Sequence, residues 1–106
     1  MYKVVTSDSF NRDVEKLDNS LQIPITNIIE QLENDPYAGR SLKYPFFREK
    51  RIKKNYRLYY LIYEEYVAIL VIAINSKKQQ DETIDKILRL LPDYKEEVRM
   101  KLSGIS

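Results

Sequence analysis

The chain has 106 residues, of which 43% are hydrophobic and 32% charged, and this composition predicts one globular domain spanning residues 1–106. It contains no cysteine and no histidine, which excludes disulfides, thiolate zinc sites and thiol nucleophiles, and removes the commonest general base. The net charge of +2 is small, so any role for charge must depend on where the charged residues lie.

The first third of the chain predicts a short strand followed by two helices. Residues 2–6, "YKVVT", are rich in β-branched residues, which favours a strand. The segment "SDSFNRDVEKL" begins with capping residues and repeats apolar residues at helical spacing. A second helix is expected from about Leu21, and it must end at the Asn34-Asp35-Pro36 stretch. So short a link between two amphipathic helices predicts an antiparallel helical hairpin.

The rest of the chain predicts a loop over residues 37–45, three strands and then helix. Residues 46–53 form a weak strand, whereas "YRLYYLIY" and "VAILVIAI" form strong strands joined by "EEY" as a tight hairpin. Helical spacing returns over residues 82–91, and "PDYKEEVRMKL" adds a short helical turn or two. The expected fold class is α+β, with an N-terminal strand and helical hairpin packed on a small, mostly antiparallel sheet and a C-terminal helix.

Three features of the sequence predict a cytoplasmic protein without a membrane anchor. The start, "MYKVVTSDSFNRDVEK", has no apolar signal-peptide core. The longest apolar run, Val67 to Ile74, is far too short to span a bilayer. The lack of cysteine fits a reducing compartment.

A block of basic residues from Arg40 to Arg57 contains eight cations and one acid, Glu49. Such a one-signed block predicts an anionic partner. Strand alternation brings Arg48 or Lys50 beside Arg57 on one sheet face, as a cationic floor with Tyr59 alongside. The alternative is that these cations only solubilise an exposed sheet face and protect its edge.

Five tyrosines fall within eleven positions, at Tyr56, Tyr59, Tyr60, Tyr63 and Tyr66. Aromatic rings among cations suit single-stranded RNA, because bases stack on rings while cations hold phosphates. We expect Tyr59 or Tyr63, rather than Tyr60, to face such a ligand. The alternative is that the tyrosines reflect strand propensity and core packing.

No Gly-rich phosphate loop, Ser-His-Asp set or zinc spacing occurs in the sequence, and no metal or cofactor is expected. RNA can be cleaved by its own 2′-OH, so a nuclease of this composition would need a lysine, tyrosine or carboxylate as its base. A lysine at the reference pKa of about 10.4 is a poor base at neutral pH. Neighbouring cations and partial burial lower a lysine pKa, which is one use for a tight basic cluster.

The segments "NDPYAGRSLK" and "FREKRIKKNYRLYYLIYEEYVAILVIAINSKK", in this order after a helical hairpin and before a closing helix, resemble the RelE/ParE superfamily of toxins from type II toxin–antitoxin pairs. RelE-like members are ribosome-dependent mRNA endoribonucleases that cut in the A site without metal or cofactor. The resemblance implies a catalytic set of Arg48, Lys50, Arg57 and Lys77. RNA contacts are assigned to Lys43, Arg51, Lys53, Lys54, Tyr59 and Lys78.

The resemblance also implies partners and alternatives. The partners would be mRNA in the ribosomal A site, ribosomal RNA and a cognate antitoxin protein that covers the basic groove. RelE-type members carry a tyrosine several residues after the last basic cluster, where this chain has Thr83. Two other hypotheses stay open: a ParE-like inhibitor that binds DNA gyrase, and a catalytically weakened relative that only binds RNA or ribosomes.

Overall fold

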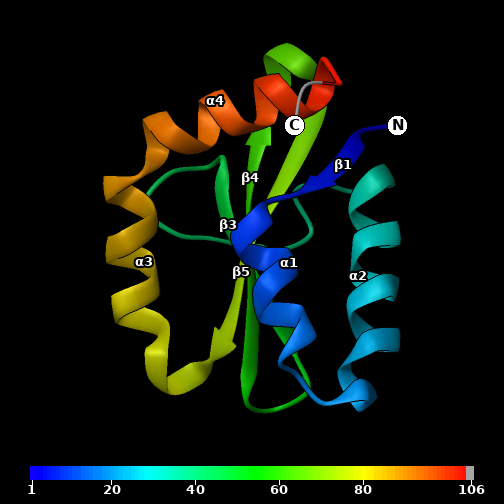
Figure 1. Cartoon of the computed structure of the whole chain (residues 1–106), viewed down its shortest axis with the longest axis vertical. Coiled ribbons are helices and arrows are strands. Elements are labelled where there is room, and N and C mark those ends of the chain that lie inside the picture. The colour runs from blue at the N-terminus through cyan, green and yellow to red at the C-terminus, as the bar shows by residue number, and fades with distance from the viewer. Residues whose placement is uncertain (105–106) are drawn as a thin grey trace.

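The computed structural model describes residues 1–104 and contains one five-stranded sheet with helices on both faces (Figure 1). The strand order is β1-β5-β4-β3-β2, and only the β1–β5 pair is parallel. The strands are β1 (Lys3–Thr6), β2 (Arg40–Ser41), β3 (Phe47–Ile52), β4 (Tyr56–Tyr63) and β5 (Ala68–Ser76). The helices are α1 (Asp8–Glu15), α2 (Gln22–Asn34), α3 (Gln80–Arg89) and α4 (Leu91–Leu102), with 3-10 turns at Asn19–Leu21, Glu64–Tyr66 and Lys77–Gln79. The predicted α+β class, with a helical hairpin before a mostly antiparallel sheet, is confirmed.

Two details differ from the sequence prediction. Residues 40–41 were expected in a loop, but they form β2, which pairs Arg40 with Glu49 and Ser41 with Arg48. A two-residue strand is too short to show the alternation of apolar and polar residues that marks a strand in a sequence, so β2 could not be recognised before its pairing with β3 was seen. The C-terminal segment was expected to add a turn or two, whereas α4 is a full helix of 12 residues that buries Tyr94 and Val98.

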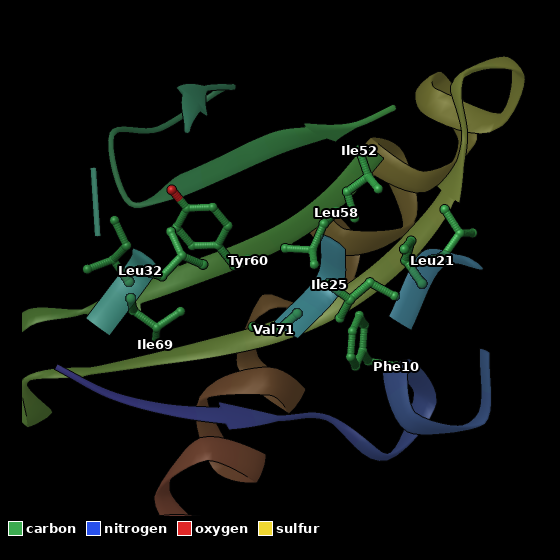
Figure 2. Close-up of a cluster of buried hydrophobic side chains, with 11 residues drawn as sticks. Phe10, Leu21, Ile25, Leu32, Ile52, Leu58, Tyr60, Ile69 and Val71 are labelled. Carbon is green, nitrogen blue, oxygen red and sulfur yellow. The ribbon is translucent and has the colours of Figure 1, made fainter. Parts of the chain in front are cut away.

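The two sheet faces carry separate cores. On one face α1 and α2 pack their apolar stripes onto alternating residues of β3, β4 and β5 (Figure 2). The members of this first core are Phe10, Leu21, Ile25, Leu32, Ile52, Leu58, Tyr60, Ile62, Ile69, Val71 and Ile74. On the other face α3 and α4 cover Phe47, Tyr59, Leu61, Leu70 and Ile72 with Ile87, Tyr94 and Val98. Burial on both faces explains why β4 and β5 are apolar almost throughout.

A β-bulge interrupts the pairing of β4 with β5. Tyr59 lies opposite Ala73 and Tyr60 lies opposite Val71, so one residue of β5, Ile72, has no partner of its own. As a result Ile72 and Ala73 both pack on the second core, where strict alternation would allow only one of them. Beyond the bulge, Asn75 therefore lies on the α3 face of the sheet.

Gly39 allows β2 to lie against β3. A Cβ atom at this position would come within 2.5 Å of the Glu49 carbonyl oxygen and 2.7 Å of the Tyr60 hydroxyl oxygen, distances that no side chain tolerates. The Tyr60 hydroxyl donates to the Pro36 carbonyl oxygen at 2.7 Å and accepts from the Gly39 N–H at 3.0 Å. These bonds fix the chain that leads from α2 into β2.

No helix among residues 1–104 combines the length and apolar character needed to cross a membrane.

Val67 carries backbone strain at the turn between β4 and β5. It has φ 47 in the left-handed region, which disfavours β-branched residues, and its side chain is exposed. We expect Val67→Gly to raise the free energy of unfolding by about 1 kcal/mol, because glycine relieves this strain and little burial is lost. Chemical denaturation measures the change. The control Val67→Ala also shortens the side chain but keeps Cβ, so it should gain less; an equal gain would show that strain is not the cause.

Candidate functional site

A polar hollow of about 470 Å³ opens where β2, β3 and β4 meet the start of α3. Its lining contains five cations and one acid. The lining residues are Ala38, Gly39, Arg40, Glu49, Lys50, Arg51, Arg57, Lys77 and Gln80. The excess of positive charge suits an anionic ligand.

Arg57 lies in the middle strand of this hollow and is only 6% exposed. The pairing places it between Arg51 of β3 and Asn75 of β5, so these three residues share the α3 face of the sheet. Its Nη1 donates to the Tyr56 carbonyl oxygen at 3.2 Å, and no carboxylate within residues 1–104 lies at ion-pair distance from it. A buried guanidinium without a carboxylate partner is prepared to bind a ligand anion.

Glu49 is the acid of the hollow and is also buried, at 5% exposure. Its Oε1 accepts from Arg40 Nε at 3.0 Å and Nη2 at 2.6 Å, and its Oε2 accepts from Gln80 Nε2 at 2.8 Å. The carboxylate therefore ties β2 and the first turn of α3 to β3. Neither Arg40, Glu49 nor Gln80 was predicted as a site residue. One feature of the sequence could have marked Glu49 as a site residue, since it is the single acid in the basic block from Arg40 to Arg57.

The structure separates Arg48 from Arg57, contrary to the predicted cationic floor. Arg48 lies opposite Tyr60 and Lys50 opposite Leu58, both on the face of the first core, whereas Arg57 lies opposite Arg51. Arg48 Nε donates to the Gly39 carbonyl oxygen at 2.9 Å and Nη1 to the Pro45 carbonyl oxygen at 2.7 Å. Its guanidinium also lies 5.1 Å from the centroid of the Tyr37 ring. Arg48 thus braces a loop instead of lining the hollow.

Lys50 and Lys77 both line the hollow, together with Arg51. Lys50 lines the hollow although its strand position alternates with that of Arg51, and it lies at the edge of β3 just beyond the last residue that β2 pairs with, Glu49. Of the four predicted catalytic residues, Lys50, Arg57 and Lys77 are therefore brought together. Arg51, predicted for RNA contact, joins them.

The remaining predicted RNA-binding lysines lie outside the hollow. Lys77 and Lys78 border a second hollow of about 640 Å³ with Asn55 and Ser76. Lys53 and Lys54 are exposed in the turn between β3 and β4, close in sequence to Asn55. Lys43 is exposed in the loop between β2 and β3. Together they extend the positive surface beyond the hollow on more than one side.

Tyr59 and Tyr63, which were expected to face a ligand, pack on the second core and do not line the cationic hollow. Tyr59 is fully buried in the second core, and its hydroxyl has no hydrogen-bond partner within the described chain. Burial, together with the nearby Glu49 carboxylate, raises the pKa of Tyr59 to about 12, so the phenol stays neutral at ordinary pH. Tyr63 packs beside Tyr66 against the second core, and burial also raises its pKa. The strand propensity and core packing of tyrosine explain both residues.

Thr83 has a structural role in α3. The side chain is buried, and its hydroxyl donates to the Gln79 carbonyl oxygen at 2.8 Å and accepts from Asn75 Nδ2 at 2.7 Å. It borders a small cavity of about 60 Å³ on the α3 side, not the cationic hollow. The next tyrosine along the chain, Tyr94, is buried in the second core.

A family model described as the ParE toxin of the type II toxin–antitoxin system parDE matches residues 4–81, about three quarters of the chain. The chain belongs to this family. It is a RelE/ParE-like toxin of a type II toxin–antitoxin system. No curated protein matches the sequence significantly.

Solved RelE structures share the fold of this ParE-family toxin. The isolated RelE toxin of E. coli matches with a TM-score of 0.64 and 17% identity over 82% of this chain and 99% of that chain. RelBE2, a toxin–antitoxin complex of Mycobacterium tuberculosis, matches with a TM-score of 0.62 and 21% identity over 72% of this chain and 98% of that chain. A RelB–RelE antitoxin–toxin complex of Methanococcus jannaschii matches with a TM-score of 0.60 and 16% identity over 74% and 96%. At these identities the likeness establishes the fold alone.

Two fully buried tyrosines of the toxin form a matched pair for stability measurements. We expect Tyr59→Phe to raise the free energy of unfolding by about 1 kcal/mol, since it removes a buried hydroxyl without a partner. Tyr60→Phe should lower it by about 1–3 kcal/mol, since it leaves the Pro36 carbonyl and the Gly39 N–H unpaired. Urea denaturation of both variants measures the difference. A loss of stability in Tyr59→Phe would show that its hydroxyl has a partner.

Proposed function

We propose that this toxin is a metal-independent endoribonuclease that cleaves mRNA in the ribosomal A site. The observation that carries the proposal is the arrangement of Arg57, which is buried in a cation-lined hollow and has no carboxylate partner among residues 1–104. An RNA phosphate would supply the missing anion. The Arg57 side chain is already buried, so it loses little conformational entropy when the phosphate binds.

Cleavage of RNA by its own 2′-OH requires only groups of the kinds that line the hollow. The ribose 2′-oxygen attacks the adjacent phosphorus, a new O–P bond forms, and the bond from phosphorus to the 5′-oxygen of the next nucleotide breaks. The products are a 2′,3′-cyclic phosphate and a free 5′-OH. One group must accept the proton of the 2′-OH, and another must donate a proton to the leaving 5′-oxygen. Negative charge grows on the phosphate oxygens in between, where fixed cations stabilise it.

The lining residues divide these roles as follows. Arg57 and Arg51 lie side by side across the β3–β4 pair and stabilise the charge on the phosphate. Lys50 and Lys77, which also line the hollow, are the candidate proton acceptor and donor. Glu49 already accepts three hydrogen bonds, from Arg40 and Gln80, and so it holds the hollow in shape.

The surrounding surface supports the proposed partners. Lys53 and Lys54 are exposed in the β3–β4 turn and Lys78 borders the second hollow, and we propose that these three lysines contact ribosomal RNA. Three of the similar structures are complexes of a RelE toxin with its RelB antitoxin. By this likeness we propose a cognate antitoxin for this chain too, one that covers the cationic hollow and keeps RNA out.

Two observations favour competing functions. The matching family is described as the ParE toxin, which favours a gyrase-binding inhibitor. Thr83 is buried where RelE-like members have a tyrosine, which favours a relative that binds RNA but cleaves it weakly. Inducing the toxin in growing cells and mapping mRNA ends separates the three. Codon-phased cuts in translated messages support the proposal, intact messages with gyrase–DNA breaks support the inhibitor, and ribosome co-sedimentation without cuts supports the weak relative.

We expect Arg57→Gln to reduce mRNA cleavage by about 100-fold or more, because it removes a fixed cation from the developing phosphate charge. Lys77→Gln should also reduce cleavage, and as an exposed residue it tests the hollow without disturbing buried structure. The matched control is Arg89→Gln, an exposed cation at the end of α3 that does not line the hollow. Primer extension on induced messages measures cleavage, and thermal unfolding confirms that each variant is folded. Full cleavage by both Arg57→Gln and Lys77→Gln would contradict the assignment.

A further inference from the structure

Two aromatic rings lie stacked on each other in the loop between β2 and β3, and the cores do not use them. The ring centroids of Tyr44 and Phe46 are 5.0 Å apart and their planes differ by 8°. The two side chains are 46% and 36% exposed, and neither belongs to either buried cluster. Each ring of a stacked pair covers only one face of the other, and this partial exposure leaves ring surface that a further planar group could contact.

The loop that carries the pair is basic in sequence. Residues 39–48, "GRSLKYPFFR", contain three cations and no acid. Two acids border an apolar hollow beside Phe46, and both already have partners. The Glu64 carboxylate accepts hydrogen bonds from the Tyr2 and Tyr37 hydroxyls, and Glu65 pairs with Lys95 at 3.2 Å. Exposed aromatic rings within a cationic segment bind single-stranded nucleic acid by base stacking and phosphate contact together.

The loop is continuous with the cationic hollow. β2 begins at Arg40, which lines the hollow, and the chain then runs through Lys43 to Tyr44 along the edge of the sheet. The Leu42 N–H donates to the Phe47 carbonyl oxygen at 2.8 Å, which holds the start of the loop against β3. Phe46 and Arg51 are five residues apart, about 16 Å along an extended chain, a distance that several nucleotides can span.

Arg48 holds the loop in place. Its hydrogen bonds to the carbonyl oxygens of Gly39 and Pro45 connect the two ends of the segment that carries Tyr44, and its guanidinium stacks over Tyr37. Pro45 also restricts the backbone between the two rings. A loop fixed in this way loses little entropy when a ligand binds.

We propose that the Tyr44–Phe46 pair is a stacking platform for a base of single-stranded RNA whose backbone continues past Lys43 and Arg40 into the hollow. The identification of the ligand as RNA rests on the proposed function. Arg48 is a positioning residue, since it acts by holding the loop. A protein that covers the rings is the competing occupant, and the lack of any acid over ten residues favours the polyanion.

The test measures binding of a fluorescent 2′-O-methyl decanucleotide, which cannot be cleaved by 2′-OH attack, by fluorescence anisotropy of the full chain. Replacing both rings with leucine, Tyr44→Leu and Phe46→Leu, keeps the surface apolar but removes stacking. Base stacking on an aromatic side chain contributes about 1–3 kcal/mol, so affinity should fall about tenfold or more. The matched control is Ile23→Ala, an exposed apolar residue on α2, which should leave affinity unchanged. Unchanged affinity in the leucine double variant would overturn the proposal.

A second variant reports contact at the site itself. The chain contains no tryptophan, so Tyr44→Trp introduces a unique fluorophore that keeps an aromatic ring at this position. It should bind the decanucleotide as tightly as the unmodified chain, and its emission should be quenched when RNA binds. Emission that does not change on RNA binding would show that no base stacks there. Thermal unfolding checks that each variant is folded.

The outcomes separate this proposal from the proposed function. If Arg57→Gln weakens RNA binding and the leucine variant leaves it unchanged, the platform is wrong and the hollow stands. If the leucine variant weakens binding and Arg57→Gln does not, the platform stands and the hollow is wrong. No RNA binding by the unmodified chain overturns both. If the leucine variant loses affinity for an antitoxin and keeps its affinity for RNA, a protein covers the rings and the platform is overturned.

Discussion

The extra residue in β5 decides which side chains of that strand reach each face of the sheet, and it places a polar contact to α3 next to Arg57. Without the bulge opposite Tyr59 and Tyr60, strict alternation would place Ile74 on the α3 face and Asn75 on the α1–α2 face. With it, Ile74 packs in the first core, and Asn75 lies beside Arg57, where its amide binds Thr83. One inserted residue therefore lets an almost wholly apolar strand fill two cores and still bind α3 through a polar side chain at its end.

The hollow is costly to build and is held by a few strong interactions. A buried guanidinium is unfavourable in the absence of an anion, and five cations around one small space repel each other. Glu49 offsets part of this repulsion, but its hydrogen bonds are to Arg40 and Gln80. Arg57 is left without a carboxylate partner in the described chain. The unfavourable electrostatic energy is therefore greatest at Arg57, and a bound phosphate would lower it.

Much of the fold could be predicted from the sequence because its elements are long and strongly periodic. Which residues of β3 lie opposite which residues of β4 could not be predicted, because this register depends on the length of one turn. Residues 53–55 link Ile52 to Tyr56, and this three-residue turn places Arg51 opposite Arg57. A turn longer by one residue would have placed Lys50 there, as the predicted cationic floor required. The left-handed residue in this turn is Lys53, not the glycine or asparagine that would have marked its geometry in the sequence.

The same change of register gives Arg48 and Arg51 opposite roles. Arg51 enters the hollow, where its charge adds to that of Arg57, and Arg48 moves to the other face and fastens the loop after β2. The strand that returns Arg40 to the hollow is also the one that leads to the stacked rings. One stretch of backbone, β2 and the loop that follows it, therefore sets the positions of both Arg40 and the exposed aromatic pair. A ligand long enough to span both would therefore meet them at a fixed separation, which a single-stranded polyanion with planar bases is suited to match.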